Sequence, residues 1–87
     1  MAEEEVGKVV KFFVKPSVAA IEMTGGTLNI GDKLMFKGHT TDFQEEVKSM
    51  QIDNVSVEKA EKGQLIGIKV RDRVREGDTV YKVVDED

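Results

Sequence analysis

Runs of β-branched and aromatic residues, repeated at short intervals, are the feature that most constrains this chain of 87 residues. Such runs favour β-strands, and the stretches between them, rich in Gly, Asp and Lys, are typical of turns. A chain of this length forms one domain, and this spacing predicts an all-β barrel or sandwich. Six strands are expected, at residues 6–14, 17–23, 33–38, 43–52, 64–70 and 79–83.

The expected strand at 43–52 has to bend. Side chains alternate along a strand, so Val47 would face one side of the sheet while Met50 and Ile52 face the other. A β-bulge near Lys48–Ser49 would bring all three to one side. A strand that bends in this way suits a small closed barrel better than a flat sheet.

The remaining segments are short. Residues 56–63 have a helix-like composition, and we expect a loop with one helical turn there and Ala60 pointing inward. The ends are acidic, so residues 1–5 and 85–87 are expected to be frayed tails on either side of a domain at 6–84.

The stretch GGTLNIGDKLMF, residues 25–36, is close to a phosphate-binding loop, because Gly26 and Gly31 flank four residues. Such a loop needs Lys directly after the second Gly and a helix after it, but Asp32 and a strand-like pattern follow here. The Gly-Asp pair recurs at Gly77–Asp78, again before an expected strand. We interpret both pairs as turns, in which Gly supplies the backbone geometry and Asp accepts from nearby N–H groups. No nucleotide or other cofactor is expected.

No constellation of residues suits catalysis or metal binding. The chain has no Cys and one His, His39, and its carboxylates at Asp42, Glu45 and Glu46 lack a partner across a cleft. We therefore expect no metal site and no enzyme. There is no signal peptide pattern and no apolar run of membrane-spanning length, which predicts a cytoplasmic protein without membrane contact.

Two stretches of the chain carry a family resemblance. GTLNIGDKLMFKG (26–38) and EVKSMQIDNVSVEKAEKGQLIGIKV (46–70) resemble segments of the β-barrel domain that follows the GTPase domain in elongation factor Tu and its relatives. The C-terminal barrel of bacterial initiation factor two is similar as well. The positions that match that barrel are Gly7, Val9, Ser49, Met50, Val57, Ala60, Gly63, Gly67, Ile68, Gly77 and Asp78.

This resemblance covers residues 6–84 and implies a six-stranded antiparallel β-barrel of the translation-protein type. Barrels of that family contact tRNA ends, the ribosome or a neighbouring domain, whereas the family's GTPase domain is absent here. The pocket for the tRNA end is not preserved. Where elongation factor Tu has Glu-Met-(aromatic or His)-Arg, this chain has the residues 51–54, Gln-Ile-Asp-Asn, and Leu65 replaces a polar Asn.

Two surfaces are candidates for a partner. The first is basic: without the six terminal acids, 11 acids remain against 13 bases, and Arg and Lys are spaced by two in KVRDRVRE (69–76). Guanidinium groups grip phosphates, so tRNA or ribosomal RNA is the expected partner. The candidate RNA-binding residues are Lys69, Arg71, Arg73 and Arg75, extended by Lys8, Lys11 and Lys15.

The second candidate surface is the Phe12–Phe13 pair. Adjacent strand residues face opposite ways, so one ring is expected outside the core, where it could bind a protein partner. The leading hypothesis is therefore a non-catalytic, translation-factor-like module that binds RNA. The alternative is a protein-interaction module or accessory subunit using the same barrel, since a related barrel accompanies some collagenase-like peptidases.

Overall fold

The structure, a computed structural model, describes residues 2–84. The regular secondary structure in this range consists of β-strands alone. The ten strands are β1 (Ala2–Phe13), β2 (Val18–Met23), β3 (Thr27–Asn29), β4 (Lys33–Lys37), β5 (Asp42–Glu46), β6 (Met50–Ile52), β7 (Val55–Val57), β8 (Lys59–Glu61), β9 (Leu65–Lys69) and β10 (Thr79–Val84). All strand pairs are antiparallel. The prediction of an all-β antiparallel fold is confirmed, but the strands number ten rather than six.

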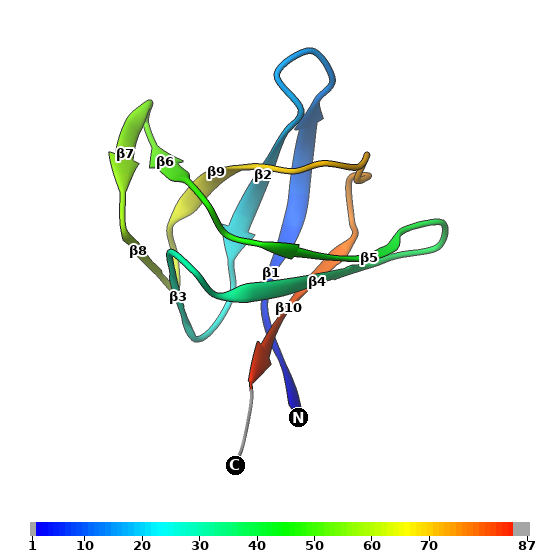
Figure 1. Cartoon of the computed structure of the whole chain (residues 1–87), viewed down its shortest axis with the longest axis horizontal. Helices are drawn as coiled ribbons and strands as arrows, with labels where there is room; N and C mark the ends of the chain where they lie inside the picture. The colour runs from blue at the N-terminus through cyan, green and yellow to red at the C-terminus, as the bar shows by residue number, and fades with distance from the viewer. Residues whose placement is uncertain (1, 85–87) are drawn as a thin grey trace.

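Eight strands form one sheet in the order β5-β4-β10-β1-β2-β9-β6-β7, and β3 pairs with β8 in a second, two-stranded sheet. Figure 1 shows β1 and β10 side by side and the turn of the β1–β2 hairpin projecting beyond the other strands. The single strand expected at 43–52 is divided into β5, which pairs with β4, and β6, which pairs with β9.

The predicted bend in this segment is confirmed. Residues 47–49 interrupt the strand, and the backbone of Val47 exchanges hydrogen bonds of 2.8 Å with Gly31 and Asp32. Val47 and Met50 are buried, and Ile52 packs against the same core. The change of direction therefore places all three apolar side chains on the inner side.

The core is built by alternation along the strands. On β2, Ala19, Ile21 and Met23 are buried while the residues between them face outward. The same alternation on β4 buries Leu34 and Phe36, which is among the largest fully buried side chains. Removing such a side chain from water contributes about 1.5–3 kcal/mol, so these positions hold the sheet together.

Both Gly-Asp pairs form the turns predicted from the sequence. Gly31 and Gly77 have φ angles of 94° and 91°, in the region that favours glycine. Asp32 Oδ2 accepts a hydrogen bond from the backbone N–H of the residue three positions earlier, at 2.7 Å, and Asp78 Oδ2 does the same at 2.8 Å. Two separate parts of the chain thus use one turn geometry to start β4 and β10.

Two expectations differ from the structure. Glu3, Glu4 and Glu5 were expected to fray, but they lie in β1 and pair with Tyr81–Val83 of β10. The stretch 56–63 contains no helical turn; instead residues 56–57 belong to β7 and 59–61 to β8, because pairing with β6 and β3 determines their conformation. Ala60 is fully buried, as expected. The acidic segment 85–87 lies outside the described residues.

Candidate functional site

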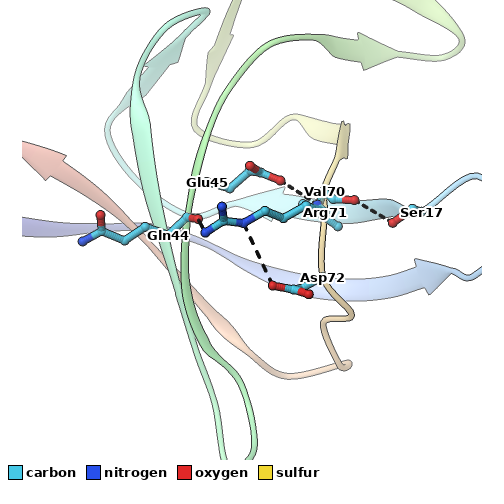
Figure 2. A network of polar contacts seen from close by, with 6 residues as sticks. All are labelled: Ser17, Gln44, Glu45, Val70, Arg71 and Asp72. Atoms are coloured by element: carbon cyan, nitrogen blue, oxygen red, sulfur yellow. Dashed lines mark hydrogen bonds and ion pairs between the residues drawn. The ribbon is translucent and has the colours of Figure 1, made fainter.

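The basic segment 69–76 is exposed but partly engaged in the fold. Lys69 ends β9, and all four candidate basic residues of this segment are exposed, while Val70 and Val74 between them are buried. The guanidinium of Arg71 donates a hydrogen bond of 2.9 Å to the backbone carbonyl of Gln44 and lies 4.0 Å from Asp72 (Figure 2). The hydrogen bond to Gln44 links the basic segment to β5.

The other basic candidates lie on or beside β1. Lys8, Lys11 and Lys15 are exposed, and the Lys11 ammonium lies 5.1 Å from the centre of the Phe13 ring. Within the described residues, none of the four ion pairs involves these three lysines. Their role in binding RNA, like that of the basic segment, stays a prediction.

Phe12 and Phe13 face opposite sides of the sheet, as predicted. Phe12 packs against the core, whereas the Phe13 side chain is 42% exposed. Phe13 borders a surface hollow of about 540 Å³ on the outer face of the sheet. The hollow is lined by Phe13, Pro16, Val18, Ala20, Gln51, Asp53, Asn54, Leu65, Ile66 and Gly67.

The floor of the hollow consists of small residues because of the strand register. Gln51 pairs with Gly67, Gly67 pairs with Ala20, and Ala20 pairs with Lys11, so one row crosses β6, β9, β2 and β1. Gly67 and Ala20 occupy the middle of this row and present almost no side chain on the outer face. Larger apolar side chains, Phe13 and Leu65, stand around them, and Leu65 is 56% exposed.

The polar rim of the hollow comes from β6 and the turn after it. Asp53 and Asn54 have φ angles of 51° and 65°, the left-handed conformation that a tight two-residue hairpin turn requires and that Asp and Asn tolerate. Among the side-chain hydrogen bonds of residues 2–84, none involves the side chains of Gln51, Asp53 or Asn54. These groups are therefore available to a ligand.

The opposite wall is the turn of the β1–β2 hairpin, which is held by Ser17. The Ser17 hydroxyl donates a 2.6 Å hydrogen bond to the Val70 carbonyl, and the Val70 N–H donates to the Ser17 carbonyl at 2.9 Å. The next N–H, that of Arg71, donates to Glu45 at 2.6 Å (Figure 2). This chain of contacts fixes Pro16 and Phe13 relative to the rest of the sheet.

The described residues offer few groups for chemistry. Within 2–84 no three His, Asp or Glu side chains are placed to hold a metal ion, and His39 is exposed in the β4–β5 loop. None of the elements in the same range is a helix with the length and hydropathy to cross a membrane. What the surface offers is an apolar hollow with a polar rim.

The sequence analysis identified Phe13 but missed the hollow. The sequence does indicate the hollow, because small or apolar residues occupy outward-facing positions on two strands: Ala20 on β2, and Leu65 and Gly67 on β9. Only the pairing of β2 with β9 shows that these positions are neighbours.

Comparisons with known proteins give close relatives for most of the chain, although no family model matches it. An uncharacterized protease of Methanocaldococcus jannaschii is 51% identical over 78 residues, which are 88% of this chain and 19% of that protein. A collagenase of Porphyromonas gingivalis is 40% identical over 78 residues, again 88% of this chain, and 22% of the collagenase. The chain thus spans about a fifth of the length of the curated relatives it matches.

Solved structures share the fold. The C-terminal domain of a Geobacillus thermoleovorans protein described as a U32 peptidase has a TM-score of 0.86 at 17% identity, over 93% of each chain. GDP-bound aIF5B of Aeropyrum pernix has a TM-score of 0.65 at 19% identity, over 95% of this chain and 14% of that one. At such identities the likeness concerns the fold alone.

These relatives correct the family and function inferred from the sequence. The resemblance to translation-factor barrels is a likeness of fold, and the RNA-binding, translation-factor function that followed from it is not supported, because the curated relatives are named protease and collagenase. The alternative, a protein-interaction module or accessory subunit using the same barrel, is not better supported. The expectation that the chain is not an enzyme is also contradicted, because these relatives are named protease and collagenase.

Proposed function

We propose that this chain is the β domain of a U32-type peptidase and that it takes part in peptide hydrolysis by holding the polypeptide substrate on its hollowed face. The observation that carries the proposal is the 51% identity over 78 residues with a protease. The match to the C-terminal domain of a U32 peptidase, over 93% of both chains, supports the same assignment.

A substrate-holding role fits the chemistry of the surface. A peptidase must bind a polypeptide that offers both apolar side chains and backbone amide groups. The hollow combines an apolar floor with Gln51, Asp53 and Asn54 on its rim, and clefts of this kind bind ligands through a few polar groups around apolar surface. Binding energy gained at such a remote surface can be used to position the bond that is cleaved.

The hollow needs a rigid support, and we propose that the sheet closes into a six-stranded barrel of the translation-protein type. Support comes from the segment 42–52, whose first half pairs with β4 and whose second half pairs with β9. If β5 and β6 are counted as one bent strand, the order β4-β10-β1-β2-β9 is joined at both ends by it. Closure would remove the free edges of the main sheet and limit its flexing.

A domain exchange tests the proposed function. The matching 78 residues of the Porphyromonas gingivalis collagenase are replaced by those of this chain, or deleted, and cleavage of denatured collagen is measured. We expect the exchanged enzyme to cleave at a rate near that of the parent and the deletion to lose about tenfold or more in kcat/KM, because substrate binding is lost. The control is a soluble collagenase variant in which an unrelated β domain replaces the same 78 residues.

Two results would contradict the proposal. The deleted enzyme could cleave as well as the parent, in which case the domain plays no part in hydrolysis. Alternatively, the exchanged enzyme could be folded, as judged by circular dichroism, and yet be as slow as the deletion.

A further inference from the structure

The floor of the hollow has the shape for an apolar side chain. Ala20 and Gly67 leave space in the middle of an outward-facing sheet surface, and Phe13, Val18 and Leu65 surround that space with apolar atoms. Its volume of about 540 Å³ lies within the range of small-ligand sites. A Leu or Phe side chain placed there would remove its own surface and that of the exposed Phe13 and Leu65 from water.

The rim has the chemistry of a peptide-binding edge. Gln51 and Asn54 each carry an amide that both donates and accepts, which matches the N–H and C=O groups of a polypeptide backbone. Both lie beside the apolar floor, so a chain that inserts one side chain would bring its neighbouring peptide groups to them. A purely apolar ligand would form no hydrogen bonds with these amides.

Charge restricts the occupant further. Asp53 is the one ionisable residue among the ten that line the hollow, and none of the four ion pairs within residues 2–84 involves it. A carboxylate beside an apolar surface favours a cation next to the buried group. A Lys or Arg of the ligand is the group in a polypeptide that supplies such a charge.

The distance between the apolar floor and Asp53 restricts the sequence of the ligand. Gln51 lies in β6 opposite Gly67 of the floor, Asp53 begins the turn that follows β6, and all three line the same hollow. Side chains two residues apart in an extended ligand point to the same side, about 7 Å from each other. A polypeptide running along β6 and β9 would therefore place an apolar side chain over Gly67 and the residue two positions away near Asp53.

We infer that the hollow binds an extended polypeptide that carries an apolar side chain and, two residues from it, a Lys or Arg that pairs with Asp53. This inference rests on the proposed function, since the polypeptide is the substrate that the peptidase holds. It adds a preference: segments with an apolar and a basic residue in alternate positions bind better than segments without them.

The test uses the isotope-labelled 87-residue chain and a blocked heptapeptide with Leu at its centre and Lys two positions away on each side. Amide shifts are followed by NMR and should concentrate at residues 13–20, 51–54 and 65–67. A peptide with Ser in place of Leu should bind about tenfold more weakly or worse, because the apolar burial is lost. A peptide with Gln in place of Lys should bind about two- to fivefold more weakly, and this difference should vanish at high salt.

Two variants locate the site. Ala20→Leu fills the floor and should abolish binding, while Gln44→Leu, which adds a similar side chain outside the hollow, should not. Asp53→Asn keeps a residue that tolerates the left-handed turn and should remove the preference for Lys over Gln, whereas Asp42→Asn on β5 should leave it unchanged. If Ala20→Leu fails to fold, the comparison of Asp53→Asn with its control Asp42→Asn still tests the inference.

The inference is overturned if the Ser peptide binds as tightly as the Leu peptide, or if a folded Ala20→Leu variant binds normally. It is also overturned if hollow resonances shift with protein concentration in the absence of peptide, because a second copy would then occupy the surface. Should peptide binding fail while the exchanged collagenase remains active, only this inference is lost. Should the peptide bind in the hollow while the deleted collagenase is fully active, the proposed function is lost instead.

Discussion

Replacement of Gly77 by Ala isolates the contribution of the Gly-Asp turns to stability. Gly77 has a φ angle of 91°, and a Cβ atom added there would have no neighbour within 4 Å. The penalty is therefore one of backbone conformation alone, which for an L-residue in this region is about 1–2 kcal/mol. For a domain of this size that corresponds to a fall in Tm of about 4–16 °C.

Gly31 provides an independent repeat of the experiment. Its φ angle is 94°, and an added Cβ would again meet nothing within 4 Å, so Gly31→Ala should cost the same. The two turns lie at opposite ends of the β4–β10 pair, in which Lys33 is opposite Val83 and Lys37 is opposite Thr79. Because they share no neighbours, the double variant should lose the sum of the two single losses.

The assay is urea unfolding followed by circular dichroism, with Gly25→Ala as the matched control. Gly25 does not have a positive φ angle, and an added Cβ would only touch the Glu5 carbonyl at 3.6 Å. That variant should be neutral or more stable by up to about 1 kcal/mol, because Ala restricts the unfolded chain. The reasoning is refuted if Gly31→Ala and Gly77→Ala both stay within about 0.5 kcal/mol of the wild type.

The two adjacent phenylalanines should affect stability and binding differently. Phe12→Ala should destabilise the fold by about 2–4 kcal/mol in urea unfolding, because Phe12 packs against the core. Phe13→Ala should destabilise it by less than about 1 kcal/mol but should weaken binding of the heptapeptide, because Phe13 is exposed beside the hollow. Equal losses of stability would contradict the assigned faces. The hydrogen bond from Lys37 to Glu3, 2.7 Å long, raises the pKa of Lys37 above its ordinary value of 10.5. The folded state therefore holds this proton more tightly, so the stability difference between wild type and Glu3→Gln should be present below pH 10.5 and disappear as the pH rises through the raised pKa. A difference that persists at higher pH, measured by urea unfolding, would show that the ion pair is not its cause.

The parts of the fold that the sequence predicted are those governed by local chemistry. Each Gly-Asp turn needs a residue with a positive φ angle and a nearby hydrogen-bond acceptor. Two adjacent residues supply both, because Gly adopts the positive φ and the Asp carboxylate accepts the hydrogen bond. The bend at 47–49 followed from the conflict between Val47 and Met50, which a regular strand would place on opposite faces. In each case the information lies within a few residues of the structure it determines.

The parts that were missed depend on pairing between distant segments. The strands β3 and β8 have three residues each, and Thr27 pairs with Glu61, more than thirty positions away in the chain. The local composition of 56–63 favours a helical turn. The segment forms strands because β7 pairs with β6 and β8 pairs with β3. The acidic start of β1 is similar, since only its pairing with β10 orders a segment that looks like a tail.

The error in family has a physical explanation that also points to the site. Most of the matching positions were glycines and buried apolar residues, such as Gly77 and Ile68, which specify turns and core rather than a function. The main departures from the elongation-factor pattern were Asp53, Asn54 and Leu65, and these line the hollow. Under the proposed function, these departures carry the functional information, because inward residues maintain a shared framework while outward residues select its partner.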